Sequence, residues 1–228
     1  SQGTVTGRYG SFDTSYLETD LSGALTSSGN VRGRTVLAQA DTNGEVDYNT
    51  NTAQNFYGAL EFDLTDSTML SLALLHQKKD ITPHNGYPTD ASGNLLNLDR
   101  DTFLGADWNH FDGRTTDLIG ELTHRFDNGG FGRVAVRSSQ RDTEFYYAFS
   151  GGAPNAAGNA SLTSTARDLD QDALALDASY SQPFETFGQV SEFVVGTDYK
   201  RYDTDYRAGG ASTSLGSIDI NNPAPSSI

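Results

Sequence analysis

The sequence predicts an all-β fold, a section of the wall of an antiparallel transmembrane β-barrel. Three observations lead to this prediction: nine segments alternate between apolar and polar residues, tight turns alternate with longer polar loops, and charged residues recur on one face of most segments. The longest strongly apolar run, Leu70 to Leu75, is too short for a membrane-crossing helix, which needs about 20 apolar residues. A barrel strand needs only alternation, so low average hydropathy is compatible with a membrane wall.

The alternation has the period of two that is typical of β-strands. Between Thr115 and Phe126, for example, Leu118 and Leu122 lie on one face, whereas Asp117 and Glu121 lie on the other. The nine expected strands are Gly3–Tyr9, Thr14–Leu25, Val31–Ala40, Thr52–Leu64, Met69–Lys79, Thr115–Phe126, Phe131–Phe149, Asp170–Gln182 and Gln189–Tyr206.

The connections between these strands alternate in length. Tight connections are expected at residues 26–30, 65–68, 127–130 and 183–188, and each contains Gly, Asn, Asp or Pro, which suit turn geometry. Longer polar loops are expected at residues 41–51, 80–114, 148–169 and from 207 onward. Short turns at one end of the strands and long loops at the other are typical of outer-membrane barrels.

A soluble β-sandwich would also alternate, but two features count against it. The expected strands mostly run to ten or more residues, whereas strands of soluble sheets usually have about five or six. A sandwich core would also bury the charges of the inner faces without partners, at a high free-energy cost. The charged residues concerned are Asp20, Glu61, Glu121, Arg137, Asp177 and Asp198.

The composition excludes several classes of function. The 228 residues include no cysteine, so neither a disulfide nor a thiolate metal site is possible, and the net charge of −15 argues against a nucleic-acid partner. The four histidines lack the spacing of metal ligands, and the acidic segment Asp41–Asp47 lacks the distal glutamate of an EF-hand. We therefore predict no metal site, no catalytic residues and no enzymatic activity.

The number of strands suggests that the chain is part of a larger barrel. Nine is odd, whereas single-chain bacterial barrels have even strand numbers and no free edges. We therefore expect residues 1–228 to form the N-terminal part of a β-barrel domain whose remaining strands lie outside this chain.

Six segments resemble, in the same order, the ferric-siderophore branch of the TonB-dependent outer-membrane receptors, near the ferrichrome, coprogen and pyoverdine receptors. These segments are Gly7–Thr14, Asp20–Leu25, Phe62–Asp66, Leu104–Asn109, Glu121–Gly129 and Val195–Tyr199. The resemblance implies a barrel of about 22 strands that encloses a plug domain. It also implies that the protein lies in the outer membrane of a Gram-negative bacterium, surrounded by lipid and lipopolysaccharide. It further implies that TonB acts through a region that precedes Ser1.

The same resemblance implies a ferric siderophore as cargo. The iron would arrive inside its chelator, so the protein would need no cofactor and no metal ligand of its own. Aromatic side chains suit such a cargo because a chelate has apolar faces and polar edges.

Two stretches supply candidate ligand contacts. The alternation set by Arg133, Arg137 and Arg141 continues to Phe145 and Tyr147, which we expect to face the lumen near the extracellular end. Phe149 could join them at the start of the following loop.

The resemblance further implies contacts from His84 and Tyr87 in the expected loop at residues 80–114. Trp108, later in this loop, is either a ligand contact or a residue that packs the loop.

Three alternatives remain open at this point. A passive porin would have an unplugged pore with an inward constriction loop. A secreted adhesion or sugar-binding module would purify without detergent. A TonB-dependent receptor could also take a different cargo, such as cobalamin or a glycan.

Overall fold

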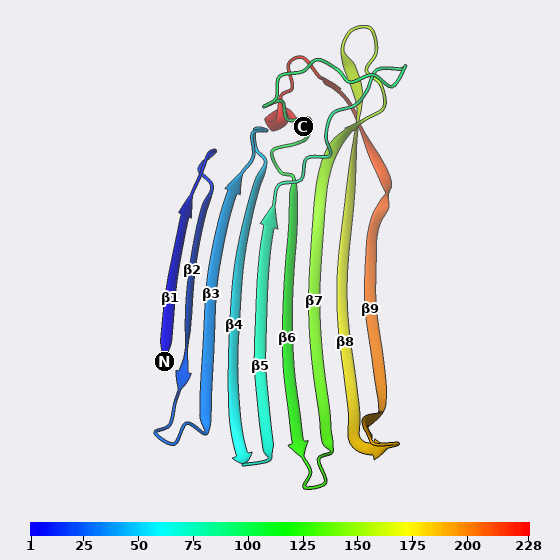
Figure 1. Cartoon of the computed structure of the whole chain (residues 1–228). Helices are drawn as coiled ribbons and strands as arrows, with labels where there is room; N and C mark the ends of the chain where they lie inside the picture. The colour runs from blue at the N-terminus through cyan, green and yellow to red at the C-terminus, as the bar shows by residue number, and fades with distance from the viewer.

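The computed structural model describes the backbone of residues 1–228 and the side chains of all but residues 210–212. Nine strands form one antiparallel sheet in chain order, β1 to β9 (Figure 1). They are β1 Gln2–Tyr9, β2 Ser15–Ala24, β3 Val31–Asn43, β4 Thr50–Thr65, β5 Thr68–Ile81, β6 His110–Arg125, β7 Phe131–Gly151, β8 Asn159–Thr186 and β9 Gln189–Asp219, followed by the 3-10 helix η1 Pro225–Ser227. The nine predicted strands are thereby confirmed. Within the described part of the chain, no helix is long and apolar enough to cross a membrane.

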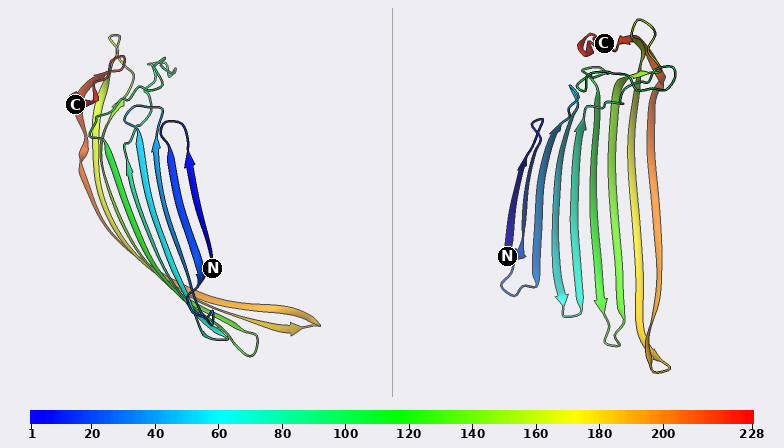
Figure 2. Two further views of the ribbon diagram at one scale, coloured as in Figure 1. Left: turned by 90° about the vertical axis from the view of Figure 1, so that its left-hand side faces the viewer. Right: turned by 45° about the horizontal axis from the view of Figure 1, so that its top comes forward.

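The sheet is curved like a section of a cylinder wall, as the two views in Figure 2 show. One of its faces is apolar over the turn-end and middle parts of the strands, and becomes acidic toward the loop end. Leu60 pairs with Leu72, Leu72 with Gly120, and Gly120 with Val136, so apolar side chains lie beside one another from strand to strand. Many of them are exposed in this chain, including Leu72 at 44% and Leu118 at 57%. We call this the apolar face, and its exposure suits contact with lipid.

The other face, which we call the polar face, carries ion pairs between neighbouring strands. Arg32 binds Glu61 at 3.1 Å and Asp63 at 2.5 Å, and Arg34 binds Asp20 at 2.7 Å. These pairs join β2, β3 and β4 across the polar face.

A second group of ion pairs joins β6, β7 and β8. Arg133 binds Glu121 at 2.7 Å and also binds Asp177, and Arg137 binds Asp117 at 2.8 Å. The charged residues that argued against a sandwich core therefore have partners on a face that is open to solvent.

The short turns are confirmed, but two of the predicted long loops are wrong. β7 and β8 remain paired up to Gly151 and Ser161, within the expected loop 148–169, and β9 continues to Asp219. These extensions are rich in Ser, Thr, Ala and Gly. Strands outside the bilayer have no lipid-facing side, so they keep their hydrogen-bond ladder without apolar alternation.

The other two loops are shorter than predicted. β3 and β4 pair as far as Asn43 and Thr50, which leaves a tight connection in place of the expected loop 41–51. The long loop before β6 is confirmed, although it spans residues 82–109 because β6 begins at His110.

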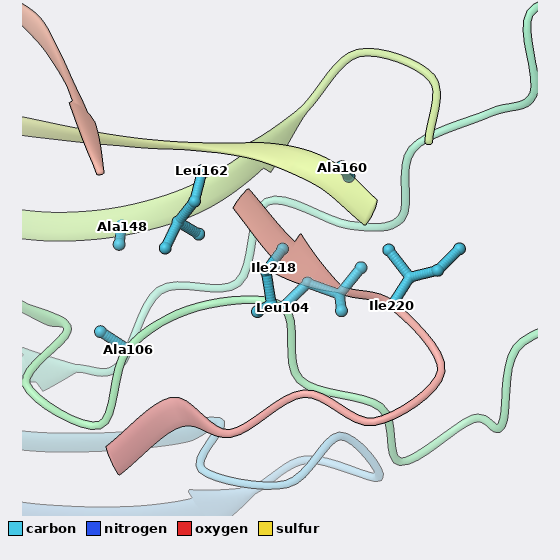
Figure 3. Close-up of a cluster of buried hydrophobic side chains, with 7 residues drawn as sticks. All are labelled: Leu104, Ala106, Ala148, Ala160, Leu162, Ile218 and Ile220. Atoms are coloured by element: carbon cyan, nitrogen blue, oxygen red, sulfur yellow. The ribbon is translucent and has the colours of Figure 1, made fainter. Parts of the chain in front are cut away.

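Three connections at the loop end of the sheet share a small hydrophobic core (Figure 3). We call it the rim cluster; it consists of Leu104, Ala106, Ala148, Ala160, Leu162, Ile218 and Ile220. It joins the 82–109 loop, the loop ends of β7 and β8, and the end of β9 with the segment that follows it. The ends of the strands and their loops are thus packed together as one unit.

The two faces predict different effects of an added positive charge. In the full-length protein, Leu72→Arg should destabilise the folded wall by roughly 2–4 kcal/mol, because it places a cation in hydrocarbon. Urea unfolding in lipid vesicles measures this loss. Ser71→Arg is the matched control, since Ser71 lies on the polar face between Glu61 and Glu121. Equal losses at the two positions would contradict the assignment of the faces.

Candidate functional site

Four aromatic rings form a continuous row on the polar face near the loop end of β6 and β7. Phe145, Tyr147 and Phe149 alternate along β7, with ring centroids 5.6 Å and 5.9 Å apart. Phe111 of β6 pairs directly with Phe145 and stacks on it at 5.5 Å, with an angle of 7° between the ring planes. We call this row the aromatic ladder. Its three residues on β7 lie on the face that the alternation of the arginines of β7 predicts for them.

A second aromatic group lies in the loops. His84 contacts Tyr87 at 5.3 Å and Phe103 at 5.7 Å between ring centroids, and Phe103 contacts Tyr48 at 5.3 Å. The Tyr87 hydroxyl donates to the carbonyl of Arg100 at 3.0 Å. We call these four residues the loop aromatic cluster. It brings the predicted residues His84 and Tyr87 together and adds Tyr48 and Phe103.

Burial changes the acid–base behaviour of this loop cluster. Burial lowers the pKa of His84, whose Nε2 atom is enclosed and has no hydrogen-bond partner. Burial, followed by the nearby charges of Asp101 and Glu45, raises the pKa of Tyr87. Both side chains are therefore held in their neutral forms near neutral pH.

Trp108 lies apart from the aromatic ladder. Its indole stacks on Tyr146 at 4.4 Å, and Tyr146 points to the opposite face from Phe145 and Tyr147 because it alternates with them. The indole nitrogen donates to the carbonyl of Ile228 at 3.0 Å, and Trp108 packs against the rim cluster. Of its two predicted roles, this geometry favours loop packing.

Asn109 attaches the 82–109 loop to β7. Its side-chain oxygen accepts from the backbone N–H of Ala148 at 2.7 Å and of Ala106 at 3.3 Å. Its side-chain nitrogen donates to the carbonyls of Ala148 at 2.9 Å and Pro83 at 3.2 Å. The amide thus continues the β6–β7 hydrogen-bond ladder beyond the last paired residues, His110 and Tyr146.

Sequence reasoning missed Phe111, Phe103 and Asn109. The predicted strand Thr115–Phe126 leaves Phe111 in the preceding loop, although Phe111 has the same parity as Asp117 and Glu121. Extending that alternation by four residues would have found it. Phe103 and Asn109 lie in irregular backbone, where no periodic pattern indicates a neighbour.

A hollow of about 870 Å³ lies away from these aromatics. It lies along the apolar face beside Leu21, Leu60, Leu72 and Leu118, where lipid chains would fill it. Among the side chains that the structure describes, no three His, Asp or Glu residues are grouped to hold a metal ion.

Comparison with known proteins gives consistent results. No protein-family model matches the chain. The ferric-pyoverdine M114 receptor PbuA of Pseudomonas sp. (strain M114) is 30% identical over 222 residues, which are 95% of this chain and 27% of the relative. The ferripyoverdine receptor of Pseudomonas aeruginosa is 32% identical over 196 residues, covering 82% of this chain and 24% of that receptor.

Solved structures agree with these relatives. The ferripyoverdine receptor of the outer membrane of Pseudomonas aeruginosa, crystallised with ferripyoverdine, superposes with a TM-score of 0.87 at 29% identity over 96% of this chain and 30% of that one. The resemblance to ferric-siderophore receptors is confirmed. The ferric-catecholate import receptor Fiu of E. coli, at 18% identity and a TM-score of 0.84, adds only that the receptor fold is shared.

The likeness covers part of a receptor. The chain spans about a quarter of the length of the curated relatives that it matches. The predicted outer-membrane location is also confirmed, and the relatives are receptors rather than enzymes, as predicted.

Asn109→Asp should loosen the attached loop. The substitution replaces the donating nitrogen by an oxygen, so the carbonyls of Ala148 and Pro83 lose their donor and meet an acceptor. We expect a local destabilisation of about 2 kcal/mol, seen as faster hydrogen exchange at residues 103–110 of the full-length protein. Asn85→Asp, at an exposed position in the same loop, is the matched control. Unchanged exchange in Asn109→Asp would contradict the attachment.

Acidification should also weaken the packing of this loop. Because the packed loop lowers the pKa of His84 from its ordinary value of 6.5, an opened loop binds more protons as the pH falls through 6.5. The loss should begin near that pH and level off below the lowered pKa. Hydrogen exchange of residues 82–109 at about pH 7.5 and about pH 5.5, corrected for intrinsic rates, measures it. A loss of the same size in His84→Asn would show that another group is responsible.

Proposed function

We propose that the whole protein is a TonB-dependent outer-membrane receptor that takes up ferric siderophores. The observation that carries the proposal is the aromatic ladder, which lies on the polar face at the loop end of a wall resembling that of ferripyoverdine receptors. Rings in this position offer a ferric chelate flat apolar contacts, and Tyr147 adds a hydroxyl.

Residues 1–228 would form the N-terminal part of the barrel domain. The outer edges of β1 and β9 have no neighbouring strand in this sheet, and a sheet in lipid cannot leave its edge hydrogen bonds unmade. Further strands, about 22 in all, would close the barrel around a plug domain. TonB would act through the region before Ser1, and lipid and lipopolysaccharide would surround the apolar face.

We assign ligand contact to Phe145, Tyr147 and Phe149 on the strand, with Tyr87 and His84 at the loops. Trp108 is given the packing role because it lies on the other face. The iron would enter within its chelator, so no protein ligand and no cofactor is required. The relatives' names support a pyoverdine as cargo, whereas nothing in the chain favours cobalamin or a glycan.

Binding by the full-length receptor in detergent tests this function. We expect saturable binding, followed by protein fluorescence, for one of three ferric complexes: a pyoverdine, the tris-catecholate enterobactin and the neutral trihydroxamate ferrichrome. Tyr147→Ala should weaken that binding roughly fivefold, since one aromatic contact is worth about 1 kcal/mol. Tyr199→Ala, on the apolar face of β9, should have no effect.

Two results would contradict the proposal, the first its receptor function and the second its placement of the binding site. The first is the absence of binding by all three complexes, together with an open ion-conducting pore in planar bilayers, which would indicate a porin. The second is an equal loss of affinity in the Tyr147→Ala and Tyr199→Ala variants, which would show that the effect does not come from the polar face.

A further inference from the structure

Three cationic side chains lie beside the aromatic ladder or on its turn-end side, all on the polar face. The register of β5 to β8 contains no shift here, so directly paired residues share a face. Lys79 pairs with Gly113, which pairs with Thr143; Arg141 is two residues before Thr143 on β7. Arg167 of β8 pairs directly with Phe145 of the ladder. We call Lys79, Arg141 and Arg167 the cation patch.

Between the level of Arg141 and the level of Phe145, the polar face of strands β5 to β9 carries the cation patch and no carboxylate. The acidic residues at this level have the opposite parity and point to the other face: Asp80, Asp112, Asp142, Glu144, Asp168, Asp170 and Asp205. The next carboxylate below on the polar face, Asp117, is already bound by Arg137 at 2.8 Å and by Ser139. None of the three cations of the patch is within ion-pair distance of a carboxylate in the described part of the chain.

Among the described side chains, four other arginines of this face are paired with carboxylates, which the cations of the patch are not. Arg32, Arg34, Arg133 and Arg137 each bind a carboxylate of a neighbouring strand. In a chain with a net charge of −15, three unpaired cations beside the candidate site create a local field that attracts anions.

We propose that the site selects ferric complexes with net negative charge, and that Arg141, Arg167 and Lys79 determine this selectivity. The inference rests on the proposed receptor function and names the charge class of its cargo. The anionic part of the complex lies against the patch at strand level, and its apolar part lies against the ladder. Glu45 and Asp101, which stand near Tyr87, keep negative charge away from the loop aromatic cluster and so orient the complex.

The test uses the full-length receptor in detergent and the same three classes of ferric complex: neutral ferrichrome, anionic ferric enterobactin, and a ferric pyoverdine chosen for its net negative charge. The complex with the highest affinity should be an anionic one. Arg141→Gln should weaken its binding about tenfold, as expected for the loss of one charge-assisted contact. The affinity of the unmodified receptor should fall with added salt, and less steeply in the variant.

Arg114→Gln is the matched control. Arg114 is also on a strand at this level, opposite Lys78 and Asp142, but it points to the other face, so its loss changes net charge equally without touching the patch. Highest affinity for neutral ferrichrome, or equal effects of the two substitutions, would overturn the charge selectivity and leave the receptor function intact. The absence of binding by all three complexes would overturn both.

Discussion

The pairing of backbone hydrogen bonds across nine neighbouring strands is the constraint on which the rest of this structure depends. A wall in lipid must satisfy each N–H and C=O within the sheet, so the strands run side by side in antiparallel order. Once the register is set, every side chain is assigned to one of two faces. The apolar face, the ion pairs of the polar face, the aromatic ladder and the cation patch all follow from that single assignment.

Period-two alternation predicted the part of the fold that lies in the membrane, because one face there must be apolar. Strands such as β4 and β5 could therefore be located to within two or three residues. Beyond the bilayer neither face has to be apolar. The loop-end halves of β8 and β9 have Ser, Thr and Gly on both faces, so their sequence alone predicts loops. Their strand structure comes from pairing with each other, which a single segment does not encode.

The candidate site likewise has a part that the sequence predicts and a part that it does not. Phe145, Tyr147 and Phe149 were predictable because they continue the parity of Arg133, Arg137 and Arg141. The position of Phe111 depended on the true start of β6, and the attachment by Asn109 depended on a loop whose backbone has no period. Trp108 shows that residue type alone does not assign a role, since the only tryptophan packs on the face away from the ladder.

The rim cluster has a consequence for the order of folding. It joins parts of the chain that are far apart in sequence; the bond between Trp108 and Ile228 spans 120 positions. Contacts of such long range form only after the intervening strands have paired, since closing the loop earlier carries a large entropic cost. The outer rim should therefore assemble last, and defects there should delay maturation of the mouth while insertion of the wall proceeds at its normal rate.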